Sequence, residues 1–509
     1  MEVGETKQLF RRPNRYLLNL ARLMYRPLAA LLCSALALCA ADDIESRMKS
    51  VMRAYALVEQ NAADPVSSEQ VFYQGAIPGL LRTLDPHSIF FDPSQFDQVK
   101  KMEASTQKGF GSIVSLLPGR VIILQTTPGT PSQKAGLAPG DDIVAVNGYI
   151  IGRLEMEQIA ELLTESRQQQ AQLEVRRPGV PRLLHFVLTP EELQAPSVER
   201  TFLLREGVGY IRVSSFDEKT GGQIKEAIDK LGGDHLKQLV LDLRNNPGGV
   251  VGAALETASL FLKPGQEIFS VRGRAMPKKA ELVPADATPY GFKLAILVNA
   301  KSASASEIVT GALQDHDRAV VLGEPSYGKG LVQNVFPLSQ GTGLALTIAL
   351  YYTPSGRSIQ KPLDSSQYEL GETTAHLNGE AVFHTDSGRV VTGGGGIQPD
   401  YVVYPPEGNR LRQALDGSGA FTNFATEFLH ANKVGEDFEV TPQLLDQFQA
   451  YLSAHDIRPG VTEWSVEQDF ILNRLKTEIF NQAFGVAKGD EVEARRDPVI
   501  QKALEVMGS

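Results

Sequence analysis

The sequence predicts a multidomain α/β protein: an α/β core with an inserted β-module, a helical element before it and a helical extension after it. Three observations support this prediction. The chain has 509 residues, which is too long for a single hydrophobic core. Residues 200–360 alternate apolar strands with helices, a pattern typical of a largely parallel sheet covered by helices. Residues 109–189 contain short strands separated by glycine turns instead.

The N-terminus has the layout of a secretory signal peptide. Basic residues from Lys7 to Arg26 precede an apolar run from Leu28 to Ala41. The run is shorter than the roughly 20 residues that span a bilayer. We therefore expect residues 1–41 to be a cleaved signal peptide and the protein to be extracytoplasmic, in a periplasm or secreted. A retained leader would instead give membrane association through the N-terminus.

The composition argues against several classes of function. The chain is 42% hydrophobic and 22% charged, which is ordinary for a soluble globular protein. Both cysteines fall in the leader, so we expect no disulfide and no thiol chemistry in the mature chain. The formal net charge is −10 and there is no basic cluster in the mature part, so we expect no nucleic-acid partner.

Hydrophobic periodicity divides the rest of the chain into four regions. These are an N-terminal helical region over 42–104, the β-module over 105–190, the α/β core over 191–405 and the helical extension over 406–509. Within them, the spacing predicts a helix over 156–166 and a strand over 171–176. We expect the strand at 344–351 to continue the parallel sheet and the polar residues 361–394 to form a long surface loop.

A serine at a strand-to-helix turn is the first candidate for chemistry. The segment Ser302-Ala303-Ser304-Ala305-Ser306-Glu307 follows an apolar strand and opens a helix. The amides of a first helical turn are unpaired donors and the helix dipole favours negative charge, so an oxyanion beside this serine would be stabilised. The alternative interpretation is that these serines only cap and pack the helix.

A lysine between glycines is the second candidate. Gly323-Glu324-Pro325-Ser326-Tyr327-Gly328-Lys329-Gly330 superficially resembles a phosphate-binding loop. The residue after the lysine would have to be Ser or Thr to hold magnesium, and residues 331–335 predict a strand where the loop needs a helix. The nucleotide interpretation therefore fails, and a solvent-exposed loop lysine remains as the alternative.

The third candidate is the turn Asp242-Leu243-Arg244-Asn245-Asn246-Pro247-Gly248-Gly249, in which a buried strand ends. Glycine lets backbone amides face a cavity, so these amides could donate to an oxyanion. An ordinary tight strand-to-helix turn is the alternative.

In their order and spacing, these three segments resemble the carboxyl-terminal processing proteases, tail-specific Ser-Lys serine peptidases with a PDZ domain. The resemblance covers about residues 45–405. It implies that Ser304 is the nucleophile, Lys329 the base and Gln333 the residue that orients the lysine. It also implies oxyanion donors on the backbone of Ala305 and in the pair Gly248-Gly249.

The fold implied by the resemblance is an α/β protease core with an inserted PDZ-like β-module. The implied function is a serine endopeptidase that cleaves proteins near unstructured or apolar C-termini through an acyl-enzyme, without metal or cofactor. Asp315 lies where some family members have an acidic partner, and we expect it to be structural. The insertion at 361–394 and the helical tail after 410 depart from the family pattern.

The β-module has a predicted role of its own. Amides around Gly109-Phe110-Gly111-Ser112 could bind the terminal carboxylate of a peptide, and the neighbouring strand edge could pair with its backbone. Phe110 and Ile113 would suit an apolar terminal side chain. We therefore expect protein or peptide partners with free C-termini. A module that serves only as a spacer is the alternative, and helices at both ends of the chain would suit a homodimer.

A lysine base needs an altered pKa. In water the lysine pKa is about 10.4, so it must fall by roughly three units for the amine to be neutral near pH 7. Burial among Val332, Val335 and Phe336 could lower it, and Gln333 could hold the amine without adding charge. Two other classes remain: an inactive protease-like scaffold that binds C-terminal peptides, and a structural envelope protein organised by the helices of 410–509.

Overall fold

The computed structural model describes residues 44–103, 106–194, 196–362, 382–405 and 408–508. The chain divides into two units, residues 1–80 and residues 81–509. The first unit contains a helix over 44–61 and a π-helical turn, η1 (Gln70–Ala76), so its predicted helical character is confirmed. The predicted leader lies outside the described residues. Among the helices that are described, none is both long and apolar enough to cross a membrane.

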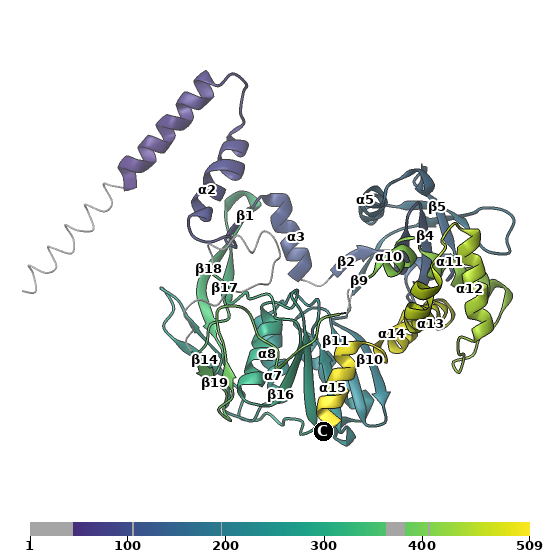
Figure 1. Cartoon of the computed structure of the whole chain (residues 1–509). Coiled ribbons are helices and arrows are strands. Elements are labelled where there is room, and N and C mark those ends of the chain that lie inside the picture. The colour runs from purple at the N-terminus through teal and green to yellow at the C-terminus, as the bar shows by residue number, and fades with distance from the viewer. Residues whose placement is uncertain (1–43, 104–105, 195, 363–381, 406–407, 509) are drawn as a thin grey trace, which may run out of the picture. The chain divides into compact units, whose positions relative to one another are not determined.

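A six-stranded sheet forms the centre of the second unit (Figure 1). Its strands, in spatial order, are β10 (Val198–Arg205), β11 (Val208–Val213), β12 (Gln238–Asp242), β15 (Lys293–Val298), β16 (Ala319–Gly323) and β21 (Tyr401–Val402). All neighbours are parallel except the antiparallel hairpin β10–β11. The carboxyl ends of β12 and β15 therefore lie side by side, and the two loops predicted to carry chemistry leave the sheet there.

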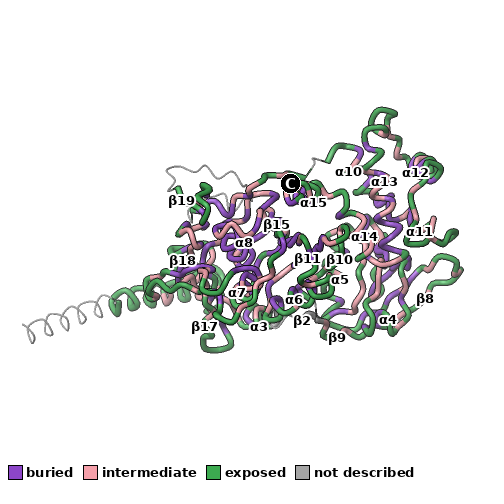
Figure 2. The backbone as a smooth tube through the Cα atoms, turned by 90° about the horizontal axis from the view of Figure 1, so that it is seen from below, coloured by how far each residue is buried: buried purple, intermediate pink, exposed green. Residues whose placement is uncertain are grey.

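Helices cover both faces of this sheet because its central strands β12 and β15 contain uninterrupted apolar runs, Leu239–Leu241 and Leu294–Val298. On one face, Leu241 and Ile296 pack with α6 (Thr220–Leu231), α7 (Val251–Ser259) and α8 (Ala305–Asp315). On the other face, Val240 and Leu297 pack with the C-terminal helix α15 (Pro498–Gly508). Successive strand residues point to opposite faces, so a strand buried on both is a continuous apolar run. Figure 2 shows buried residues concentrated on these strands and on α8.

A second, antiparallel sheet lies beside the first. It consists of β1 (Ile89–Phe91), β13 (Glu267–Arg272), β14 (Lys279–Leu282), β17 (Leu331–Pro337) and β18 (Gly343–Tyr352). The prediction that 344–351 continues the parallel sheet is therefore wrong. Strands β17 and β18 are joined by the short turn η4 (Ser339–Gly341), and so short a connection permits only antiparallel pairing.

The predicted surface loop over 361–394 is partly corrected. Its described end contains an antiparallel pair, β19 (Phe383–His384) with β20 (Val390–Val391). Residues 363–381 lie outside the described residues. The loop prediction rested on polarity and on the glycine run Gly393–Gly396, and a short hairpin can have the same composition as a loop.

The β-module is an antiparallel sheet with one principal helix. Its strands are β3 (Ser112–Leu117), β4 (Arg120–Thr126), β5 (Asp142–Val146), β6 (Tyr149–Ile150), β7 (Ala171–Arg176) and β8 (Leu184–Leu188). The bounds predicted for α5 (Met156–Ser166) and for β7 are confirmed. The chain enters the module through β2 (Thr106–Gly109) and leaves it through β9 (Glu191–Gln194). These two strands pair with each other in an antiparallel ladder.

The predicted helical extension is also confirmed. It contains α10 (Arg410–Gly417), α11 (Ala420–Ala431), α12 (Pro442–Ala454), α13 (Val461–Phe484), α14 (Val486–Ala494) and α15. The first four helices share a core rich in aromatic rings, with Phe421 stacked on Phe448. Helix α15 departs from this bundle and packs on the central sheet.

Candidate active site

Ser304 occupies a sharp turn between β15 and α8, where it is the N-cap residue. Its backbone has φ 54° and ψ −114°, a combination that residues other than glycine rarely adopt. Strained conformations of this kind cost about 1–3 kcal/mol and cluster at functional sites. The turn places Ser304 at the carboxyl end of a parallel strand, the edge at which open α/β sheets bind ligands.

Gly248 lies directly against this turn. A Cβ atom added to it would be 2.6 Å from the carbonyl oxygen of Ala303 and 2.8 Å from the amide nitrogen of Ala305, and its φ is +95°. Its amide donates to Asn246 Oδ1 at 2.9 Å. Within the described residues, neither the amide of Gly249 nor that of Ala305 has a hydrogen-bond acceptor. The structure therefore offers two open donors near Ser304.

Lys329 lies on the loop between β16 and β17, with its side chain partly buried. Burial lowers the pKa of this lysine, and the charge of Glu307 opposes that change. Of the expected apolar neighbours, Val332 packs against the main core. Phe336 is exposed, so its predicted part in a pocket is wrong: it lies further along β17, on the hairpin that leaves the core.

One buried carboxylate holds the Ser304 turn and the Lys329 loop together. Glu307 Oε2 accepts hydrogen bonds from the backbone amides of Ser304 at 2.9 Å and Lys329 at 3.0 Å. Its Oε1 accepts from Ser326 Oγ at 2.5 Å and from the Gly328 amide at 2.7 Å. Burial raises the pKa of Glu307, although these four donors oppose the rise.

The role of Glu307 was not predicted from the sequence, although a signal was present. Glu307 follows Ser304 by three residues, and Ser-x-x-Glu at a helix start predicts that the glutamate binds the N-cap amide. That hydrogen bond is present. The contacts to residues 326–329 come from another loop and could not be inferred from this spacing.

Gln333 is held by a turn that lies 246 residues earlier in the chain. Its Nε2 donates to the carbonyl oxygen of His87 at 2.6 Å. Burial and the charge of Lys329 both lower the pKa of His87, which therefore lies in the electrostatic field of the lysine. Within the described residues, no hydrogen bond joins Lys329 Nζ to the Gln333 side chain or to Ser304 Oγ.

The turn that holds Gln333 is built around Asp85. The Asp85 carboxylate accepts hydrogen bonds from the amides of His87 and Ser88, both at 2.8 Å, and from Ser88 Oγ at 2.7 Å. It also accepts from Thr347 Oγ1 on β18 at 3.2 Å. The sequence pattern of Asp85-Pro86-His87-Ser88 indicates only a helix-breaking turn. The structure adds that this turn is fastened to the β17–β18 hairpin.

Asp315 lies at the opposite end of α8 from Ser304. Its carboxylate forms a buried ion pair with Arg357 at 2.7 Å and accepts from the Ser355 amide at 3.0 Å. These contacts tie α8 to the segment after β18 and support the expectation that Asp315 is structural.

The β-module has an open strand edge beside its helix. Strand β3 pairs only with β4 among the described strands, and α5 packs against it. Ile113 on β3 is exposed, whereas Phe110 packs partly into the module core. Gly111 has φ +76°, and Ser112 Oγ donates to Ser132 Oγ at 2.5 Å.

Gly109, the first of the predicted peptide-binding residues, belongs to the β2–β9 ladder opposite Glu191. The loop from Gly109 to Ile113 therefore joins this ladder to the open edge. An extended peptide can add to such an edge through backbone hydrogen bonds, and Ile113 is available to contact its side chains. Phe110 is less available, because it is partly buried against the core of the module.

Comparison with known proteins relates the chain to two families. Residues 207–366 match peptidase family S41, and residues 122–177 match the PDZ domain. The carboxy-terminal-processing protease of Bartonella bacilliformis is 36% identical over 306 residues, which cover 58% of this chain and 68% of that protein. CtpB of Bacillus subtilis, a carboxy-terminal processing protease, is 30% identical over 326 residues, 63% of this chain and 67% of that protein.

A third relative, the carboxyl-terminal-processing protease of a Synechocystis species, is 32% identical over 311 residues, 60% of this chain and 72% of that protein. Among solved structures, the photosystem II D1 C-terminal processing protease is 26% identical, with a TM-score of 0.40. That match covers 70% of this chain and 87% of the other.

Proposed function

The chain belongs to the carboxy-terminal processing proteases of peptidase family S41, and from this premise we propose that it is an endopeptidase that cleaves proteins near unstructured or apolar C-termini. Family membership makes it a serine-type peptidase. One observation carries the choice of residues: a single oxygen of Glu307 binds the backbone amides of Ser304 and Lys329. The proposed nucleophile and the proposed base thus belong to one buried hydrogen-bonded unit.

The proposed reaction has two stages. Ser304 Oγ attacks the scissile carbonyl carbon while its proton passes to neutral Lys329 Nζ. The tetrahedral intermediate collapses, the lysine gives this proton to the departing amine, and an ester to Ser304 remains. Water then attacks the ester with Lys329 as base, and the proton returns to Ser304 as the acid product leaves. Each stage leaves the enzyme in its starting protonation state.

The negative oxygen that forms in each stage needs preorganised donors. The amides of Ala305 and Gly249 are open, and we propose them as the oxyanion donors. Gly248 would serve a different purpose, because its amide already donates to Asn246 Oδ1 and its missing side chain makes room for the Ser304 turn. Loss of one such donor typically costs about 10²–10³ in rate.

The lysine must be neutral before it can accept a proton. Its lowered pKa supports this role, since burial penalises the charged form. For the transfer, Lys329 Nζ must come within hydrogen-bond reach of Ser304 Oγ; such contacts often tighten only when substrate binds. We propose that Gln333, fastened through His87, lies beside the lysine and orients its amine.

We propose that the PDZ-like module recognises the C-terminus of the substrate. The open edge of β3, with exposed Ile113, supports binding of an extended peptide whose last residues are apolar. The leader-like N-terminal pattern supports an extracytoplasmic location. The partners would then be unfolded or partly unfolded proteins with free C-termini outside the cytoplasm.

The test is cleavage of an unfolded protein, such as casein, by the chain from residue 42 onward, with mass spectrometry of the products. Ser304→Ala and Lys329→Ala should each abolish cleavage. Ser259→Ala is the matched control, because Ser259 Oγ only donates to the Leu255 carbonyl of its own helix. Unchanged cleavage by Ser304→Ala would exclude the mechanism. Binding of the casein by the wild type without any cleavage would indicate a scaffold instead.

A further inference from the structure

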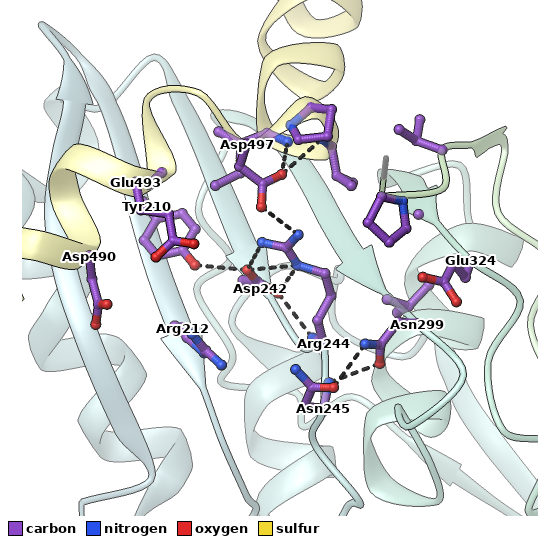
Figure 3. Close-up of a pocket in the computed structure, with 18 of the residues that line it drawn as sticks. Tyr210, Arg212, Asp242, Arg244, Asn245, Asn299, Glu324, Asp490, Glu493 and Asp497 are labelled. Carbon is purple, nitrogen blue, oxygen red and sulfur yellow. Dashed lines mark hydrogen bonds and ion pairs between the residues drawn. The ribbon is translucent and has the colours of Figure 1, made fainter. Parts of the chain in front are cut away.

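The C-terminal extension reaches the loop that carries the proposed oxyanion donor. A pocket of about 260 Å³ lies between the carboxyl ends of the central strands and the helices α14 and α15. Figure 3 shows the residues that line it. Arg244, from the loop after β12, points between Asp242 and Asp497 in this view. Asp497 immediately precedes α15, so two segments more than two hundred residues apart meet here.

Arg244 makes charge-assisted hydrogen bonds on two sides. Its guanidinium donates to both oxygens of Asp242, at 2.6 and 3.0 Å, and its Nη1 donates to Asp497 Oδ2 at 2.7 Å. The Asp242 side chain is only 1% exposed and also accepts from Tyr210 Oη at 2.7 Å. Bonds between a guanidinium and carboxylates are strong and directional. The two carboxylates therefore fix the direction of the Arg244 side chain.

Asp497 is itself held in place by the helix that it begins. Its Oδ1 accepts hydrogen bonds from the amides of Val499 at 2.8 Å and Ile500 at 3.0 Å, so the same side chain caps α15 and binds Arg244. Both of these residues are buried against the central sheet. The position of the carboxylate is thus set by the docking of the entire helix.

Hydrogen bonds continue from Arg244 to the Ser304 turn. Next along the chain, the Asn245 amide donates to Asn299 Oδ1, and Asn299 Nδ2 donates to Asn245 Oδ1, both at 2.9 Å. The carbonyl oxygen of Asn246 accepts from the Ala303 amide and from Ser306 Oγ, both at 3.0 Å. Arg244 therefore anchors the loop to Asp497, and Asn246 anchors it to Ala303 and Ser306, which lie on either side of the Ser304 turn.

We infer that Asp497 is a positioning residue of the proposed active site: through Arg244 it holds the loop 244–249, and with it the Gly249 amide, in register with Ser304. The inference rests on the proposed function. The match to peptidase family S41 ends at residue 366, so it assigns no role to α15. The positioning role of Asp497 implies that catalysis requires α15.

The test compares Asp497→Asn, Asp497→Glu and Asp497→Ala in the chain from residue 42 onward. An asparagine keeps the oxygen that caps α15 but removes the charge that binds Arg244. We expect Asp497→Asn to lower kcat about 10- to 100-fold with KM within about twofold of wild type, because small displacements of catalytic groups cost about that much. Asp497→Glu should recover part of kcat. Glu505→Gln, in an exposed ion pair on the same helix, is the matched control.

Thermal unfolding of each variant separates positioning from folding. A folded Asp497→Asn variant with wild-type kcat would overturn the inference. Unfolding of that variant below the assay temperature would also overturn it, because the Asp497–Arg244 pair would then be merely structural. Cleavage by Ser304→Ala would exclude the proposed function, and with it the inference that rests on it. If Ser304→Ala is inactive while Asp497→Asn and Asp497→Ala keep full kcat, only the positioning role fails.

Discussion

Glu307 Oε2 accepts hydrogen bonds from the backbone amides of both Ser304, at 2.9 Å, and Lys329, at 3.0 Å. The carboxylate is fully buried, with two further donors on its other oxygen. A buried carboxylate is stable only when its lone pairs are used, and here four donors converge on it. Glu307 thus fixes the spacing between the Ser304 turn, which follows β15, and the Lys329 loop, which follows β16.

Replacing this acceptor should weaken both loops. In Glu307→Gln an NH₂ group replaces one oxygen, so two of the four donors face another donor. We expect the free energy of unfolding in urea to fall by about 1–3 kcal/mol and kcat to fall at least about tenfold. Glu505→Gln, the same substitution at an exposed site, should change neither quantity. Full stability and full activity in Glu307→Gln would show that the carboxylate does not join the loops.

The pH profile of cleavage should follow Lys329. The reaction needs the neutral amine, so kcat/KM should rise with pH through the pKa of this lysine, and burial places that rise below the usual lysine range. The Glu307 charge raises the pKa of Lys329. Its removal in Glu307→Gln should therefore move the rising limb to lower pH. A limb at the ordinary lysine pKa, or one that stays in place in the variant, would count against Lys329 as the base.

The two glycines beside Ser304 should not tolerate a side chain. A Cβ on Gly249 would lie 2.0 Å from the Phe216 carbonyl oxygen, and one on Gly248 would lie 2.6 Å from that of Ala303. Both residues also have positive φ. We expect Gly248→Ala and Gly249→Ala each to lower kcat/KM more than about 100-fold, since the loop must move.

The control for these glycines is Gly252→Ala in helix α7. A Cβ there has Val250 as its nearest neighbour at 3.9 Å, and alanine favours a helix over glycine by about 1 kcal/mol. This variant should keep its activity and unfold at a slightly higher urea concentration. An active Gly249→Ala enzyme would show that the loop geometry is not critical.

Recognition by the PDZ-like module should depend on Ile113. A charged side chain on the open edge of β3 would oppose an apolar peptide terminus, so Ile113→Glu should raise KM for substrates with apolar C-termini and leave kcat nearly unchanged. Ile150→Glu is the matched control: Ile150 is similarly exposed (42% against 38%) but lies on β6. Equal KM values for the two variants, across peptides that differ only in their last residues, would argue against the module as the recognition site.

The fold was largely predictable because its signals are local. Strand β7 alternates buried and exposed residues, and α5 has a clear helical stripe, so their bounds follow from periodicity. The sheet to which β18 belongs was not predictable in the same way. Its apolar pattern suits a parallel or an antiparallel sheet, and only the pairing with β17 decides between them.

The candidate site was predictable only in part. The order and spacing of Ser304, Lys329 and the glycine turn are present in the sequence. The contact of Gln333 with His87 joins residues 246 positions apart, and that of Arg244 with Asp497 joins residues 253 positions apart. No local periodicity encodes such contacts, because tertiary packing creates them. The exposure of Phe336 was missed for the same reason.

The PDZ-like module is joined to the C-terminal helices by side-chain hydrogen bonds. Arg120 on β4 binds Asn423 of α11, and Gln125 on the same strand accepts a hydrogen bond from the Val486 amide at 2.9 Å. The module thus contacts helices encoded three hundred or more residues later. A chimera that transplants only 106–194 would expose these surfaces and lose their partners. The unit to be grafted, or inherited together during recombination, comprises the module and the helices that cover it.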